Sequence, residues 1–229
     1  IQCYTERFDN GDYLAFFRSP FNSKNNLTYL HNVYHENMKK YFNFGKYIIA
    51  VNMIGTDFQD RNNGSDQDSD SGYATNQADI VEHARKCYMK YPTIVNNIPK
   101  DSNKYDNTMD DYAKIDNNLA GSQRDIGESS NIAQIAQTYA CNFKDQKYID
   151  YVCILSVLAQ AAIDSAKRRF DIDIADEIRR IKNDMDIKEN LYPNFWRLIR
   201  RDTPLSKVNT NLKCPMNYLY DLELTKFRN

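Results

Sequence analysis

The sequence predicts an α+β protein with a strand-rich N-terminal part and a mainly helical C-terminal half. Up to about residue 60, apolar residues occur in short runs bounded by turn-forming Asn, Asp, Gly, Ser and Pro, which is typical of strands and turns. After about residue 78, apolar residues recur at intervals of three and four, the spacing of one helix face. We therefore expect strands over residues 1–77 and a helical region, packed on those strands, over residues 78–229.

Four segments of the N-terminal part are predicted to be strands. Residues 13–17 and 27–30 are compact apolar runs with turn-forming residues on both sides. Residues 46–54 are β-branched and aromatic and predict a buried strand, and residues 72–75 predict a strand that returns from it. Residues 31–43 have weak periodicity, so a helix and an irregular excursion both stay open there.

The first helices of the C-terminal half are predicted from their apolar spacing. Residues 78–91 predict a helix that Pro92 limits, because the residue before a proline disfavours helical dihedrals. Residues 99–124 hold few apolar residues and predict an exposed loop. A further helix is expected to begin at Asn131, which forms a capping pair with Gln134.

Two more helices are expected near the C-terminus. Residues 151–163 are apolar on nearly all sides, which predicts a buried helix that is too short to span a bilayer. Residues 174–185 place Ile and Met at helical spacing and charges elsewhere, which predicts an amphipathic helix.

An acidic stretch separates the last two predicted strands. Asp66, Asp68 and Asp70 occupy alternate positions, and an extended chain points alternate side chains to the same face. Three carboxylates on one face repel one another unless a cation lies between them. Oxygen ligands favour Mg²⁺, Mn²⁺ or Ca²⁺ over Zn²⁺, so we expect a divalent-metal site here.

This stretch has three other interpretations. An EF-hand loop beginning at Asp66 needs Gly in its sixth place and Glu in its twelfth, where the chain has Ser71 and Gln77. A phosphatase-type aspartate nucleophile follows an apolar strand directly, whereas residues 61–65 intervene here. A solvated turn stays open on spacing alone, since Asp, Asn, Ser and Gly dominate turns.

The charge balance and the cysteine content limit the classes of protein to which this chain can belong. With 30 basic and 31 acidic residues, the chain lacks the overall charge of a nucleic-acid binder, so any basic surface has to be local. The chain has neither a signal sequence nor an apolar run of eighteen residues, so we expect no membrane association. Five scattered cysteines without a C-x-x-C pair are typical of a reduced, cytoplasmic protein. The start at Ile1 suggests a piece of a longer protein.

Two basic groups in the helical half have two interpretations each. They could contact phosphates, or stack on nucleic acid where aromatic residues adjoin them, and they could equally be solvated helix ends and faces. The residues are Lys167, Arg168 and Arg169, and Arg197, Arg200 and Arg201.

The apolar strand that leads to Arg18-Ser19-Pro20, followed by the acidic loop, resembles the catalytic barrel of two-barrel RNA polymerases. This family includes the largest subunit of the cellular enzymes, the RNA-silencing polymerases, and single-chain phage and prophage relatives. The last two groups are the nearest in pattern. Its motifs are R-x-P after a strand and a later D-x-D-G-D loop. A helix after the loop, a helix opening at residues 127–131, and a small-residue helix over residues 159–167 fit the silencing-type order. The resemblance covers residues 11–170.

The resemblance implies a double-psi β-barrel and Mg²⁺- or Mn²⁺-dependent nucleotidyl transfer by a two-metal mechanism. Asp66, Asp68 and Asp70 would be the catalytic metal ligands. Arg18 would hydrogen-bond the ribose of an incoming ribonucleoside triphosphate, and Pro20 would fix its approach. The implied partners are a nucleic-acid template, DNA or RNA, and the RNA product.

The chain departs from the family in two ways. Ser69 stands where the family has glycine, although serine is also small and tolerated in turns. The family also needs a second barrel that supplies lysines to the phosphates, which we expect from upstream sequence or from another chain. Without it, this catalytic half would be inactive. Two other functions stay open: a non-enzymatic module whose loop binds a divalent cation such as Ca²⁺, and a sugar-nucleotide transferase with a D-x-D metal loop.

Overall fold

The computed structural model describes residues 1–66, 70–102, 105–165 and 169–226. Two compact units make up the chain, residues 1–97 and residues 98–229. The first carries a curled five-stranded sheet and the second is helical, so the predicted α+β class is confirmed at this level. The units divide at residues 97 and 98 rather than at 77 and 78, because the helix after the sheet packs on the sheet itself.

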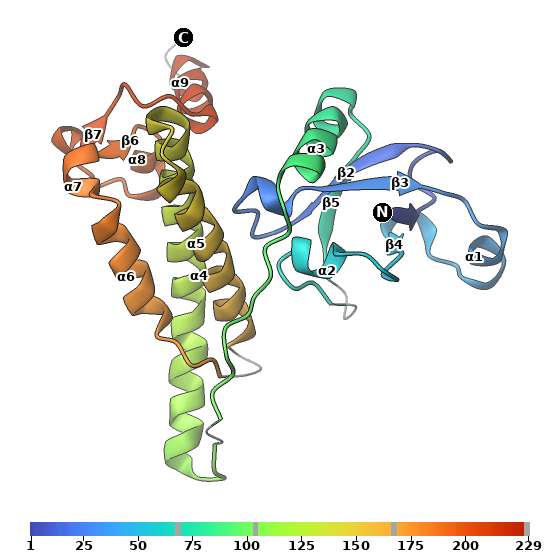
Figure 1. Ribbon diagram of the computed structural model, residues 1–229, viewed down its shortest axis with the longest axis horizontal. Helices are drawn as coiled ribbons and strands as arrows, with labels where there is room; N and C mark the ends of the chain where they lie inside the picture. Colours follow the sequence, from blue (N-terminus) through green and yellow to red (C-terminus); the bar gives the residue numbers. More distant parts are fainter. Residues whose placement is uncertain (67–69, 103–104, 166–168, 227–229) are drawn as a thin grey trace. The chain divides into compact units, whose positions relative to one another are not determined.

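The sheet of the first unit is assembled from strands that are far apart in the sequence (Figure 1). β1 pairs in parallel with β3, and all other pairs are antiparallel. Its spatial order is β4-β1-β3-β2-β5, so β4 and β5 are the edge strands. The strands are β1 Gln2–Tyr4, β2 Tyr13–Arg18, β3 Thr28–Asn32, β4 Ala50–Val51 and β5 Gly72–Thr75.

Alternation along β2 determines which side chains reach which face. Leu14 and Phe16 point to the inner face, where Leu14 packs with Leu30 and Phe58 in a small core. Ala15 lies on the opposite face, in a second core that includes residues of α3 (Ala78–Lys90). Each fully buried leucine contributes about 1.5–3 kcal/mol to stability. Arg18, two residues beyond Phe16, therefore belongs to the inner face.

The predicted strand over residues 46–54 is wrong for most of its length. Residues Gly45–Tyr47 form a 3₁₀ turn, η2, and only Ala50–Val51 pair with a neighbouring strand. Ile49, Val51 and Met53 pack against the inner core at alternate positions. Asn52 is exposed, and Ile54 is 90 % exposed. A segment at the edge of the sheet buries the side chains of one face only. A continuous run of β-branched and aromatic residues does not indicate which of its positions are buried.

Two segments that the sequence left open or assigned to turns are now defined. α1 (Glu36–Tyr41) lies within residues 31–43, and the turn after Asn22 contains a 3₁₀ helix, η1 (Lys24–Asn26). α2 (Phe58–Arg61) follows β4 and leads to the acidic loop. The predicted strands over residues 13–17, 27–30 and 72–75 are confirmed as β2, β3 and β5.

The second unit is built on a long helical hairpin. α4 (Met109–Phe143) and α5 (Gln146–Asp164) pack along each other, and α6 (Ile174–Asp184) packs on both. Their core includes Ile132, Ile135, Leu155 and Leu158. Smaller elements complete the unit: α7 Ile187–Asn190, β6 Tyr192–Pro193, α8 Trp196–Ile199, η3 Leu205–Lys207, β7 Val208–Asn209 and α9 Pro215–Lys226.

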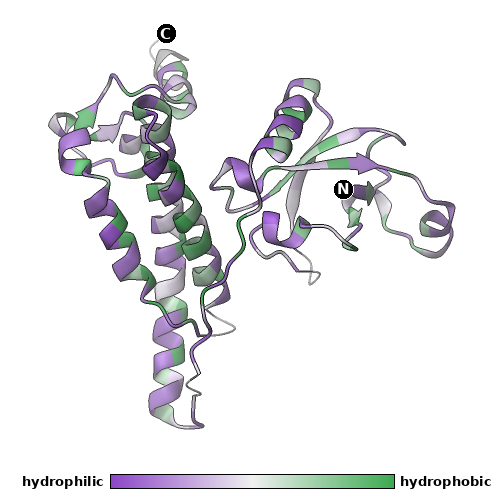
Figure 2. Cartoon of the chain, viewed as in Figure 1, coloured by the Kyte–Doolittle hydropathy of each residue, from purple (hydrophilic) through white to green (hydrophobic). Residues whose placement is uncertain are grey.

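The predicted loop over residues 99–124 is wrong from Met109 onward. α4 begins there, and the Thr108 hydroxyl oxygen accepts a hydrogen bond from the backbone N–H of Asp111 as its N-cap. Asn131 therefore lies in the middle of α4, and residues 127–131 do not open a helix. The first turns of α4 are mainly hydrophilic (Figure 2), so apolar periodicity gave no signal there. The predicted helices over residues 78–91, 151–163 and 174–185 are confirmed as α3, α5 and α6.

Candidate active site at the acidic loop

Arg18 and the acidic loop meet because of the register between β2 and β5. These strands are antiparallel, with Arg18 opposite Gly72. β5 therefore begins beside the end of β2, and Asp70, two residues before Gly72, comes next to Arg18. The Nη2 atom of Arg18 lies 2.7 Å from Oδ1 of Asp70, although the two residues are 52 apart in the sequence.

Asp70 also joins the two ends of the acidic loop. Its Oδ2 atom accepts a hydrogen bond of 2.9 Å from the backbone N–H of Asp66. Within the described residues, each carboxylate oxygen of Asp70 thus has one hydrogen-bond partner, and a carboxylate can accept about four hydrogen bonds or metal contacts. The side chains of Arg18 and Asp70 are 15 % and 23 % exposed. Their ion pair is therefore screened less by solvent than a surface ion pair.

The inner face of the sheet opens into a pocket of about 740 Å³ at this point. Arg18, Asp66 and Asp70 line its polar side, and Phe16 and Phe58 line it from the sheet and α2. Residues 47–51, which include the edge strand β4, also line it. The pocket therefore combines a few charged groups with apolar side chains, which is the usual composition of a small-molecule site.

Asn63 fixes the backbone just before the acidic loop. It has a left-handed conformation with φ of 56°, which asparagine tolerates better than most residues. Its Nδ2 donates to the carbonyl oxygen of Pro20 at 2.7 Å, and its Oδ1 accepts from Asn26 Nδ2 at 3.0 Å. The carbonyl oxygens of Asn62 and Asn63 in turn accept from Arg18 Nη1, each at 3.3 Å. Arg18 is thereby held on two sides, by this turn and by Asp70.

Arg61 stabilises the turn at residues 62–64 through bonds to other segments of the first unit. It is 3 % exposed, and its guanidinium lies 4.6 Å from the ring centroid of Tyr88. Its Nη1 donates to the carbonyl oxygen of Asn25 at 3.0 Å and to that of Tyr91 at 3.3 Å, and its Nε donates to Asp57 Oδ2 at 3.2 Å. These bonds join α2, η1 and the end of α3 to the residues that precede the loop.

Asp57, whose side chain is 36 % exposed, completes this cluster. Burial alone would raise the pKa of its carboxyl, but a hydrogen bond from Thr93 and the charge of Arg61 outweigh burial and lower the pKa below 3.8. Asp57 therefore stays ionised at neutral pH and balances the buried charge of Arg61.

Three of the five predicted site residues line the pocket, and the other two do not belong to its described lining. Arg18, Asp66 and Asp70 line one pocket, whereas Pro20 contributes its carbonyl oxygen to the Asn63 turn. Asp68 lies outside the described residues. Among the residues that are described, no three His, Cys, Asp or Glu side chains gather as a metal site requires. That finding does not bear on the predicted trio, since Asp68 is one of its three members.

The donor chemistry of this site fits a hard divalent cation. Asp66 and Asp70 bring carboxylate oxygens to one pocket wall, and Ser65 adds a hydroxyl to the same lining. Mg²⁺ and Mn²⁺ prefer such oxygen ligands. Carboxylates that ligate metals are commonly hydrogen-bonded by neighbouring groups, as Asp70 is by Arg18.

Sequence reasoning missed the residues that hold this site in place. Arg61, Asn62, Asn63 and Asn26 are buried polar residues, and their importance comes from bonds to segments more than thirty residues away. The only local signal was the Asn62-Asn63-Gly64 run, which indicates a turn but not its partners.

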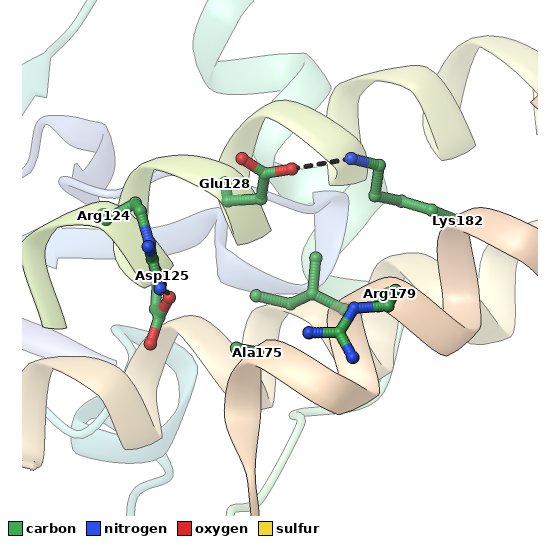
Figure 3. Close-up of a pocket in the computed structure, with 7 residues that line it drawn as sticks. Arg124, Asp125, Glu128, Ala175, Arg179 and Lys182 are labelled. Carbon is green, nitrogen blue, oxygen red and sulfur yellow. Dashed lines mark hydrogen bonds and ion pairs between the residues drawn. The ribbon is translucent and has the colours of Figure 1, made fainter. Parts of the chain in front are cut away.

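A second pocket of about 300 Å³ lies between α4 and α6 (Figure 3). Its acids and bases pair with one another: Glu128 accepts from Lys182 at 2.8 Å, and Asp125 lies 3.7 Å from Arg124. Burial raises the pKa of Asp125. Because these charges neutralise one another locally, we assign them to the packing of the two helices.

Two of the described residues in the basic groups of the helical unit form ion pairs with acidic residues. Arg169 pairs with Asp101 at 3.0 Å and lies 5.0 Å from the ring centroid of Tyr105. Arg200 lies 3.7 Å from Glu128. Lys167 and Arg168 fall outside the described residues. The ion pairs of Arg169 and Arg200 favour a structural role for these two residues.

Comparisons of the chain with models of known protein families, with curated proteins and with solved structures find no match. In the described part of the chain, no helix combines the length and the apolar character that a membrane crossing requires. All five cysteines are free thiols.

Proposed function

We propose that this chain is the catalytic half of a nucleic-acid-templated RNA polymerase of the two-barrel type, with the curled sheet as its double-psi barrel. One observation carries the proposal. Arg18 at the end of β2 and Asp70 of the acidic loop form an ion pair at the wall of one pocket. The resemblance needs these two motifs close together in one site.

Asp66, Asp68 and Asp70 would hold Mg²⁺ or Mn²⁺ in this enzyme. When bound, the metal ions would activate the primer 3′-hydroxyl and neutralise the leaving pyrophosphate. The chain's own residues supply the positioning. The Asn63 turn and Asp70 fix the guanidinium of Arg18 at the pocket wall, where its remaining N–H groups can donate to the ribose of a nucleotide.

The pocket has a suitable size for this substrate class. Its volume of about 740 Å³ lies within the range of about 300–1,000 Å³ that is typical of small-molecule and cofactor pockets. Its apolar wall can cover a sugar or base, while the acids and Arg18 face the phosphates and the ribose. The template, the RNA product and the second barrel would complete the site from outside this chain.

Ribonucleotide incorporation tests the proposal. The chain is combined with the polypeptide that carries the second barrel and is supplied with template, ribonucleoside triphosphates and Mg²⁺. Asp68→Ala should lower incorporation at least about 100-fold, since electrostatic stabilisation of this kind contributes about 10²- to 10³-fold. Asp60→Asn on α2 removes one exposed carboxylate nearby and should leave the rate unchanged. Incorporation that persists in Asp68→Ala would refute the proposal.

A further inference from the structure

A segment rich in aromatic residues and lysines borders the candidate active site. It comprises residues 39–48, from the last turn of α1 through η2, and we refer to it as the aromatic–lysine segment. Tyr41, Phe42 and Tyr47 are 69 %, 50 % and 91 % exposed. Large rings are usually buried, so three exposed rings within seven residues indicate a surface with a binding role.

The charge of this segment has one sign. Lys39, Lys40 and Lys46 are exposed, and the chain has no acidic residue from 37 to 56. A local excess of three positive charges stands out in a chain whose net charge is −1. Such a patch attracts a polyanion, and its lysines also disfavour the alternative of an apolar protein contact.

The rings are arranged for stacking. Phe42 and Phe44 are stacked with centroids 5.2 Å apart and an interplanar angle of 12°. The Nζ atom of Lys40 lies 5.1 Å from the ring centroid of Tyr41. Tyr47 and Ile48 line the same pocket as Arg18, Asp66 and Asp70. The segment thus runs from solvent to the rim of the candidate active site.

We propose that the aromatic–lysine segment binds single-stranded nucleic acid next to the active-site pocket. Bases would stack on Tyr41, Phe42 and Tyr47, and the three lysines would contact phosphates. This inference rests on the proposed polymerase function and names the surface that would hold a single strand as it enters or leaves the site. It adds a partner contact beside the acidic loop, whose Asp66 and Asp70 line the same pocket as Tyr47.

Fluorescence anisotropy with a short, labelled single-stranded RNA tests this inference on the whole chain. The combined variant Phe42→Ala and Tyr47→Ala should bind at least about 30-fold more weakly, because each of the two stacked bases contributes about 1–3 kcal/mol. Tyr218→Ala on α9 removes a ring that is 62 % exposed and should change nothing. Since Tyr47 is almost fully exposed, its removal should not unfold the chain, which circular dichroism can verify.

A second set of variants tests the lysines by salt dependence. Replacing Lys39, Lys40 and Lys46 by Gln should flatten the slope of log K against log salt by about 2, since each contact to a single strand contributes about 0.7. The same change at the exposed Lys188, Lys207 and Lys213 should leave the slope unchanged. The inference is overturned if the chain does not bind the RNA, or if both sets of variants bind it like the parent chain. These titrations contain EDTA and no nucleotide, so their failure is distinguishable from a failure of the polymerase proposal.

Discussion

The phenyl ring of Phe16 lies directly over Gly72, in the space that a Cβ atom at position 72 would occupy. Phe16 belongs to β2, and Gly72 is the first residue of β5. The ring also packs on Phe58 of α2, with centroids 5.5 Å apart. This close approach brings the start of β5, and with it Asp70, to the end of β2 where Arg18 stands.

Gly72→Ala should therefore destabilise the first unit and disturb the site. The added methyl group has to displace Phe16 or push β5 away, and overpacking of this kind costs about 1–3 kcal/mol. The free energy of unfolding in urea measures the effect. Gly127→Ala is the control, because a Cβ at position 127, in the middle of α4, meets no atom within 4 Å. That change should stabilise the chain by up to about 1 kcal/mol. Equal stability of Gly72→Ala and the parent chain would contradict the close contact.

Asn63 should stabilise the first unit mainly through the hydrogen bonds of its side chain, and less through its backbone conformation. Asn63→Gly keeps the left-handed turn but removes the bonds to Pro20 and Asn26, whereas Asn63→Ala also adds backbone strain. Each lost bond to a buried partner costs about 1–3 kcal/mol, so both variants should be less stable than the parent chain, with Ala the worse of the two. Thermal unfolding compares them. If Asn63→Gly matched the parent chain, the turn would not depend on these hydrogen bonds.

The ionisation of Asp57 should make the stability of the first unit depend on pH. Its pKa is lower in the folded chain than its ordinary value of 3.8. The stabilisation is therefore fully present above that ordinary value and is lost as the pH falls through the lowered pKa. Asp57→Asn should be less stable than the parent chain at neutral pH, and the difference should shrink below about pH 4.

Urea unfolding at neutral and acidic pH measures this convergence. Asp60→Asn, on the exposed side of α2, is the control and should stay close to the parent chain across the same range. A constant difference between Asp57→Asn and the parent chain at all pH values would rule out the proposed role of the Asp57 charge. Arg61→Met should also destabilise the first unit, because it leaves the carbonyl oxygens of Asn25 and Tyr91 without their donor, and each lost bond to a buried partner costs about 1–3 kcal/mol.

The sequence revealed elements whose stability comes from local patterning. β2, α5 and α6 bury regular apolar faces, so their periods were readable in advance. The polar first turns of α4 and the one-sided edge strand β4 carry no such pattern, and both were mispredicted.

The candidate site, too, could be predicted from the sequence only in part. The acidic loop and Arg18 were visible as motifs, but their contact depends on the β2–β5 register. The support from Arg61 and Asn63 depends on partners that lie far away in the sequence, and no local pattern identifies them.

Divalent-metal binding by the chain tests the central claim most directly. Mn²⁺ titrations followed by electron paramagnetic resonance should show binding by the parent chain that Mg²⁺ displaces. Asp68→Ala should bind Mn²⁺ at least about 10-fold more weakly, because even the loss of a residue that only supports a ligand costs about 10- to 100-fold in affinity. Asp60→Asn should bind like the parent chain. Tight Ca²⁺ binding that Mg²⁺ does not affect, or Mn²⁺ binding that survives in Asp68→Ala, would contradict a catalytic metal site in the acidic loop.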